Sequence, residues 1–194
     1  MSERVAEIQR HTGETDVCLR LNLDGVGQAE VATGVGFLDH MLDLFARHGR
    51  FDLLIGANGD TQVDDHHTAE DVGIVLGEAV RKALGDKQGV ARYGHAYVPM
   101  DEALVRSSLD LSGRPYCIYA VAVPRAKVGA FDTELVEHFC QSLAFHALLT
   151  LHVDLIRGSN THHILEAVFK SMALALHQAS RVVRPDLPTT KGLL

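Results

Sequence analysis

A short string of histidine and glutamate occurs twice in the chain. It reads HHTAE at 66–70 and HHILE at 162–166. On a helix, residues three and four positions apart share one face, so each glutamate is expected to meet both of its histidines around one point. Imidazole and carboxylate groups gathered in this way are typical ligands of a divalent metal ion.

Each string has a histidine partner upstream in the chain. The segment FLDHMLDLFARH at 37–48 aligns with LVEHFCQSLAFH at 135–146, which places His40 over His138. Because the same segment precedes both strings, the chain is an internal duplication. The candidate ligands suit two metal ions with four protein ligands each, and they are His40, His66, His67, Glu70, His138, His162, His163 and Glu166.

Length and composition are those of an ordinary globular chain. Of the 194 residues, 46% are hydrophobic and 22% are charged. No apolar run approaches the roughly 18 residues of a membrane span, and the polar start resembles no signal peptide, so we expect a cytoplasmic protein without a membrane partner. The net charge of -7, without a long basic stretch, argues against nucleic acid as a partner.

Hydrophobic periodicity predicts the elements that must position the candidate ligands. Alternation favours a strand at 16–24, to which 29–33 is expected to return as a hairpin partner after the DGVG turn. Asp64 or Asp65 is expected to cap one long helix, and Asn160 or Thr161 another. Further strands are predicted at 4–10, 51–57, 93–99, 103–110, 116–123 and 149–156, and helices at about 37–49, 66–85, from 132 or 133 through 143, and 162–180.

The repeated order of elements predicts the fold class α+β. Each half is expected to be a small mixed β-sheet with two helices on one face, and the halves to pack together through their helices. The first half is 1–91 and the second half 92–180, in one compact domain. Residues 181–194 have no periodicity and are expected to form a C-terminal tail.

The motifs, taken together, resemble those of the imidazoleglycerol-phosphate dehydratase family, enzymes of histidine biosynthesis. The resemblance extends from about residue 4 to residue 194 and rests on GVGFLDHMLD, DDHHTAEDVGIVLGEA, PMDEAL, DLSGRP, EHF, HHILEAVFK and LPTTKGLL. It implies two Mn²⁺ ions on the eight ligands named above, although the ligand types alone suit several divalent ions. It also implies a homo-oligomer of roughly two dozen copies built from trimers, with sites at subunit interfaces.

The resemblance further implies a lyase reaction, the dehydration of D-erythro-imidazoleglycerol phosphate to imidazoleacetol phosphate. A metal-bound imidazolate would expel the hydroxyl through a diazafulvene-like intermediate, and the resulting enol becomes the ketone. Catalytic roles are implied for Glu14, His40 and His67. Binding of the phosphorylated imidazole substrate is implied for Arg92, Arg114, Lys170, Thr189 and Lys191.

Two departures from the family pattern are visible. Thr189 stands where a serine is common, which keeps the hydroxyl, and Leu44 stands where a glutamine is common. Two other functions stay open from the residues alone. One is a dinuclear metallohydrolase with a metal-bound hydroxide as nucleophile, and the other is an assembly scaffold whose metal ions only join subunits.

Overall fold

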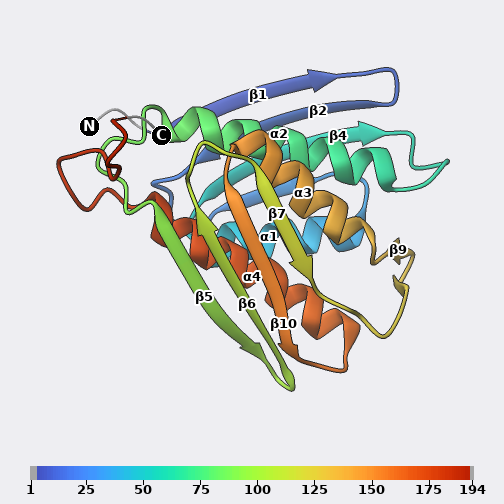
Figure 1. Ribbon diagram of the computed structural model, residues 1–194. Coiled ribbons are helices and arrows are strands. Elements are labelled where there is room, and N and C mark those ends of the chain that lie inside the picture. Colours follow the sequence, from blue (N-terminus) through green and yellow to red (C-terminus); the bar gives the residue numbers. More distant parts are fainter. Residues whose placement is uncertain (1–3, 193–194) are drawn as a thin grey trace.

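Two four-stranded sheets enclose four helices in the computed structural model, which describes residues 4–192 (Figure 1). The first three residues of the predicted first half and the last two of the predicted tail lie outside the described residues. Among the helices described, none is long and apolar enough to cross a membrane.

The first half of the chain forms one sheet and two helices. Its sheet has the strand order β1-β2-β4-β3, in which only β3 and β4 run parallel. The elements are β1 Val5–His11, β2 Thr15–Asn22, β3 Ala29–Ala32, α1 Gly36–Gly49, β4 Asp52–Gly59 and α2 His66–Leu84.

The second half repeats this plan. Its sheet has the order β5-β6-β10-β7, which is the first order with each strand replaced by its counterpart, and β7 and β10 run parallel. The elements are β5 Tyr93–Met100, β6 Ala103–Asp110, β7 Tyr116–Ala120, β8 Lys127–Val128, β9 Phe131–Asp132, α3 Leu135–Ala147, β10 Thr150–Arg157 and α4 Thr161–Ser180. The predicted α+β duplication is therefore confirmed.

The helices form the middle layer, where α2 packs on α3 and α1 packs on α4 (Figure 1). Each pair joins the two halves, as expected. Alternating inward residues of the sheets, such as Val17 and Leu19, and the apolar stripes of the helices make one continuous core. Gly77 of α2 lets the helices approach closely, because a Cβ there would lie 2.6 Å from the carbonyl oxygen of Leu143 on α3.

The expected hairpin of 16–24 with 29–33 is wrong. Strand β2 is already paired on both edges, by β1 and by β4, and β3 instead joins the far edge of β4 in parallel. A parallel pair needs a long connection, which α1 supplies. The third helix begins at Leu135 rather than at 132 or 133, because Phe131–Asp132 forms the small hairpin strand β9 with β8.

Candidate metal centre

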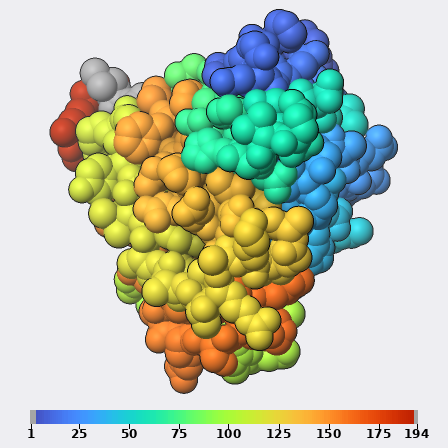
Figure 2. Space-filling model, turned by 90° about the vertical axis from the view of Figure 1, so that its right-hand side faces the viewer, coloured from blue at the N-terminus to red at the C-terminus, as the bar shows by residue number. Residues whose placement is uncertain are grey.

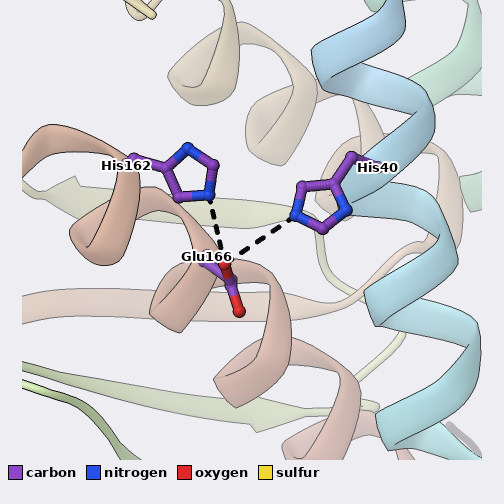
Figure 3. A group of neighbouring side chains, drawn as sticks. All are labelled: His40, His162 and Glu166. Carbon is purple, nitrogen blue, oxygen red and sulfur yellow. Dashed lines mark ion pairs between the residues drawn. The ribbon is translucent and has the colours of Figure 1, made fainter.

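Three candidate ligands converge where α1 passes the first turns of α4 (Figure 3). Nε2 of His162 lies 3.2 Å from Oε2 of Glu166, and Nε2 of His40 lies 3.8 Å from the same oxygen. The possible ligand atoms of the three side chains all lie within 4.8 Å of one another. We call this group the α1/α4 cluster.

The local sequence explains how α4 presents its two ligands. The side chain of Asn160 accepts hydrogen bonds from the backbone N–H groups of His162 and His163, which confirms one of the two predicted caps and starts the helix there. His162 and Glu166 are then four residues apart and share a face. The Glu166 side chain is only 9% exposed. Burial acts to raise its pKa, but Lys170 and the two imidazoles lower it, so the carboxylate is ionised.

A second cluster occupies the corresponding place between α2 and α3. Nε2 of His66 lies 3.9 Å from Oε2 of Glu70, and the rings of His66 and His138 are 4.8 Å apart between centroids. This α2/α3 cluster is more open, with Glu70 46% exposed. Within the described residues, only the α1/α4 cluster brings all its ligand atoms within 4.8 Å.

Each cluster combines the two halves of the chain. His40 comes from the first half and meets the second HHxxE string, whereas His138 comes from the second half and meets the first string. The crossing follows from the packing of α1 on α4 and of α2 on α3. The duplication therefore gives two similar clusters, neither of which belongs to one half alone.

The second histidine of each string points away from its cluster. Nδ1 of His67 lies 3.0 Å from Asp60, and Nδ1 of His163 lies 2.8 Å from Glu102. The expectation that each glutamate meets both histidines is thus wrong within the described chain. Asp60 and Glu102 hold the second imidazole of each string on the side that faces away from the glutamate of that string. The hydrogen bond from His163 and two from backbone N–H groups lower the pKa of Glu102 to about 2. Asp60 raises the pKa of His67, and Glu102 raises that of His163.

A further carboxylate faces the outer nitrogen of each of these histidines. Oε1 of Glu14 lies 3.7 Å from Nε2 of His67, and Oδ2 of Asp101 lies 3.8 Å from Nε2 of His163. Glu14 and Asp101 are both exposed and both lie in the first turn of their sheet, between β1 and β2 and between β5 and β6. The repeat thus gives Glu14 a counterpart to which sequence reasoning assigned no role.

The implied phosphate ligands lie in two separate places. Lys170 pairs with Oε1 of Glu166 beside the α1/α4 cluster. The other four, Arg92, Arg114, Thr189 and Lys191, gather where β5 begins and β6 ends. Arg92 pairs with Asp110, donates to the carbonyl of Pro188 and accepts through its own carbonyl from Leu111 N–H. Arg114 donates to the Ser112 carbonyl, and the Thr189 hydroxyl accepts from Lys191 N–H. We call these four residues the basic end.

A hollow of about 320 Å³ opens beside His162. It is lined by Arg125, which precedes β8, by Lys127 of β8 and by the turn before α4. Figure 2 shows the face of the molecule that includes β8 and β9 (gold). The β1–β2 turn (dark blue) and the segment before α2 (teal) lie above them, and the turn before α4 (orange) lies below them. Sequence reasoning missed both cationic residues because only the tertiary structure brings them beside the turn before α4.

Both clusters fit a bound divalent cation. Each offers imidazole nitrogen and carboxylate oxygen, which suit metals such as Zn²⁺ and Mn²⁺. In the α1/α4 cluster, one oxygen of a largely buried carboxylate faces two imidazoles, and a cation between them would satisfy all three groups.

Comparison with known proteins identifies the family. The model of the family described as imidazoleglycerol-phosphate dehydratase matches residues 33–176, which include all eight candidate metal ligands. The chain belongs to the imidazoleglycerol-phosphate dehydratase family. It is therefore a dehydratase, a lyase of histidine biosynthesis.

Imidazoleglycerol-phosphate dehydratases resemble the chain over its whole length. That of Desulforamulus reducens is 55% identical, with 100% of both chains covered, and that of Acetivibrio thermocellus is 53% identical, with 99% of this chain and 100% of the relative covered. The crystal structure of the Staphylococcus aureus dehydratase matches with a TM-score of 0.83 and 43% identity, over 93% of this chain and 99% of that one. The Pyrococcus furiosus structure, in complex with (S)-C348, matches with a TM-score of 0.84 and 36% identity, over 96% and 100%.

Proposed function

We propose that the chain dehydrates D-erythro-imidazoleglycerol phosphate with the help of two bound divalent cations, for which Mn²⁺ is the expected metal. The observation that carries the metal dependence is the convergence of His40 and His162 on one oxygen of Glu166. The α2/α3 cluster of His66, Glu70 and His138 would hold the second ion. A divalent cation, when bound, acts as a Lewis acid toward the imidazole ring of the substrate, which favours loss of the hydroxyl from the adjacent carbon.

The carboxylates of Glu14 and Asp101 are the candidates for proton transfer. Each lies next to an outward imidazole nitrogen and is open to solvent, so a substrate bound there is within reach of an exposed carboxylate oxygen. Glu14 would remove the proton from the carbon next to the one that loses the hydroxyl. The substrate phosphate would lie against cationic side chains, because guanidinium and ammonium groups donate charge-assisted hydrogen bonds to it.

Assembly of several copies is part of this proposal, because the groups that a single substrate must contact lie far apart within one chain. The backbone of Arg92 donates to the carbonyl of Ala179, so the basic end adjoins the C-terminal turns of α4, whereas Glu166 lies near its start. Ala179 lies 13 residues beyond Glu166, which corresponds to about 20 Å of helix at about 1.5 Å per residue. This is longer than a substrate with three carbons between ring and phosphate, so the basic end of one copy would serve the metal clusters of another.

The outward histidines support the same arrangement. His67 and His163 keep Nε2 on the side away from their own clusters, where each could complete the ligand set of a neighbouring copy. A homo-oligomer of roughly two dozen chains built from trimers is the expected assembly.

The test is turnover of imidazoleglycerol phosphate by protein that has been stripped of metal and then reloaded. We expect a ketone product only after Mn²⁺ or a similar divalent ion is restored, with two ions bound per chain. Turnover at an undiminished rate in the stripped protein would refute the metal dependence. Metal binding without any turnover would favour the scaffold, and hydrolysis of the phosphate ester would favour the metallohydrolase.

A further inference from the structure

Asp60 and Glu102 make the same contact in the two halves of the molecule, but they come from different places in the repeat. Asp60 follows β4, immediately before the segment that leads into α2, and Glu102 lies in the turn between β5 and β6. Each carboxylate contacts Nδ1 of the second histidine of an HHxxE string, at 3.0 Å for His67 and 2.8 Å for His163. Neither carboxylate touches the three side chains of the α1/α4 cluster in the described structure.

The contact determines which imidazole nitrogen carries the hydrogen. An ionised carboxylate only accepts hydrogen bonds, so Nδ1 of each histidine must be the donor. In the neutral ring the lone pair is then on Nε2. Nε2 is also the nitrogen on the exposed side of both rings, facing Glu14 or Asp101 rather than the core.

We infer that Asp60 and Glu102 are positioning residues, which fix the tautomer and the direction of His67 and His163 so that each presents Nε2 to a metal ion. The inference rests on the proposed metal-dependent function. It gives a role to two carboxylates that are not candidate ligands themselves. A carboxylate behind a metal-bound histidine holds the ring in place, and its loss typically weakens metal binding about 10- to 100-fold.

The two carboxylates differ in a way that makes the inference testable. Oε1 of Glu102 accepts from the backbone N–H groups of Ser159 and Asn160, at 3.1 and 2.7 Å, while Oε2 faces His163. In the variant Glu102→Gln, the amide oxygen must stay on the backbone donors, and the NH₂ group is directed at Nδ1 of His163. Nδ1 then has to accept, Nε2 carries the hydrogen, and the ring cannot bind a metal through Nε2.

The side chain of Asp60 lacks, within the described structure, the backbone donors that fix the orientation of Glu102. Both of its oxygens lie close to Nδ1 of His67, at 3.1 and 3.0 Å, and in the described structure neither is held by a backbone donor. In Asp60→Asn the amide can therefore turn its oxygen to Nδ1 and keep the original tautomer. Asp60→Ala removes the acceptor altogether. The isosteric amide is thus expected to be harmful at position 102 and tolerated at position 60.

The experiment measures the affinity of the assembled protein for Mn²⁺, from the electron paramagnetic resonance signal of the free ion during a titration. We expect Glu102→Gln and Asp60→Ala each to weaken one of the two Mn²⁺ sites about 10- to 100-fold. Asp60→Asn should bind like the unmodified protein. Glu30→Gln, which removes an exposed charge from β3, is the control for the loss of one negative charge.

These Mn²⁺ affinities separate a positioning role of the two carboxylates from a merely electrostatic one, because loss of charge alone would make Asp60→Asn as harmful as Glu102→Gln. Equal weakening by the two amides, or no weakening by Glu102→Gln and Asp60→Ala, would overturn the inference. If Glu102→Gln disturbs the turn before α4 and fails to fold, the two Asp60 variants decide the matter alone. An unmodified protein that binds no Mn²⁺ would instead overturn the proposed function, and this inference with it.

Discussion

The ammonium group of Lys170 pairs with Oε1 of Glu166, one helical turn earlier on α4, while Oε2 of the same carboxylate faces His40 and His162. Lys170 therefore lies beside the α1/α4 cluster, and its ammonium, which is itself a cation, cannot serve as a metal ligand. Its ammonium can donate to an anion at the edge of that cluster. In the proposed function, this pair would lie between the bound cation and the substrate phosphate.

Replacement of Lys170 by alanine is expected to act mainly on the substrate. A charge-assisted hydrogen bond to phosphate contributes about 1.5–3 kcal/mol, so KM should rise about 10- to 100-fold, with a smaller change in Mn²⁺ affinity. Steady-state kinetics and a Mn²⁺ titration on the same sample check this. Lys82→Ala, at an exposed lysine that donates to the carbonyl of Glu7, is the control. A larger loss in metal affinity than in KM would contradict the assignment.

Substitution of Glu14 by glutamine keeps the shape of the side chain and removes its ability to take a proton. If this carboxylate transfers a proton in the reaction, kcat should fall about 10²- to 10⁴-fold. Glu14 is exposed and lies 3.7 Å from Nε2 of His67, so the fold and Mn²⁺ binding are expected to change little. A variant with the kcat of the unmodified enzyme would exclude Glu14 from the chemistry. Asp101→Asn tests its counterpart in the same way.

Removal of metal is expected to affect activity and assembly together. In the proposed assembly, His67 and His163 would supply metal ligands to a neighbouring copy, so chelation should reduce both turnover and particle mass. Light scattering and a turnover assay, repeated after Mn²⁺ is restored, measure the two effects. Full activity in a chelated sample, or a loss of activity with the particle mass unchanged, would contradict this coupling.

Alanine at Gly94 should destabilise the second half. A Cβ at this position on β5 would lie 1.8 Å from the carbonyl oxygen of Ala175 on α4, and backbone of a packed helix cannot move aside easily. Overpacking of this kind costs about 1–3 kcal/mol or more, so the unfolding midpoint should fall clearly in a thermal or urea titration. Gly36→Ala is the matched control, since nothing lies within 4 Å of its added Cβ. Equal stability of the two variants would refute the steric argument.

The stability of the protein should depend on pH through His177. Burial lowers the pKa of this histidine, and the charges of Arg181 and Arg50 act in the same direction. The folded state thus favours the neutral imidazole of His177. The stability that depends on this neutral ring is fully present above the unfolded pKa of about 6.5, and it is lost as the pH falls toward the lower pKa of the folded state. Between pH 7.5 and 5, Tm should therefore fall more for the unmodified protein than for His177→Gln. Parallel decreases in the two proteins would show that this group is not responsible.

The duplication and its elements could be predicted because periodicity and repetition are properties of the sequence itself. The alternation around Val17 and Leu19 and the apolar stripes of the helices predicted nearly every element within a few residues. The partner of Ala29–Ala32 could not be predicted in this way. A four-residue strand carries no information on which edge it joins, and that choice was made by the packing of the whole sheet.

The candidate site was predictable to the extent that its chemistry lies in short strings. The HHxxE repeats identified His162 and Glu166 as neighbours, but helical spacing alone did not reveal that His163 turns away from them. The reason lies in Glu102, which is 61 residues earlier in the chain and lies in a turn of another sheet. Asp60, Arg125 and Lys127 were missed for the same reason, since only tertiary structure brings loop residues to a site.

The packing of α1 on α4 and of α2 on α3, each across the two halves, has a consequence for the origin of the protein. An ancestral chain of half this length would have formed these clusters only by pairing with a second copy, because His40 and His138 each meet the string of the other half. Fusion of two such genes would place both partners on one polypeptide. Their association would then be intramolecular and would take place at a high effective concentration. Divergence of the two copies after such a fusion would account for the contrast between the largely buried Glu166 and the exposed Glu70.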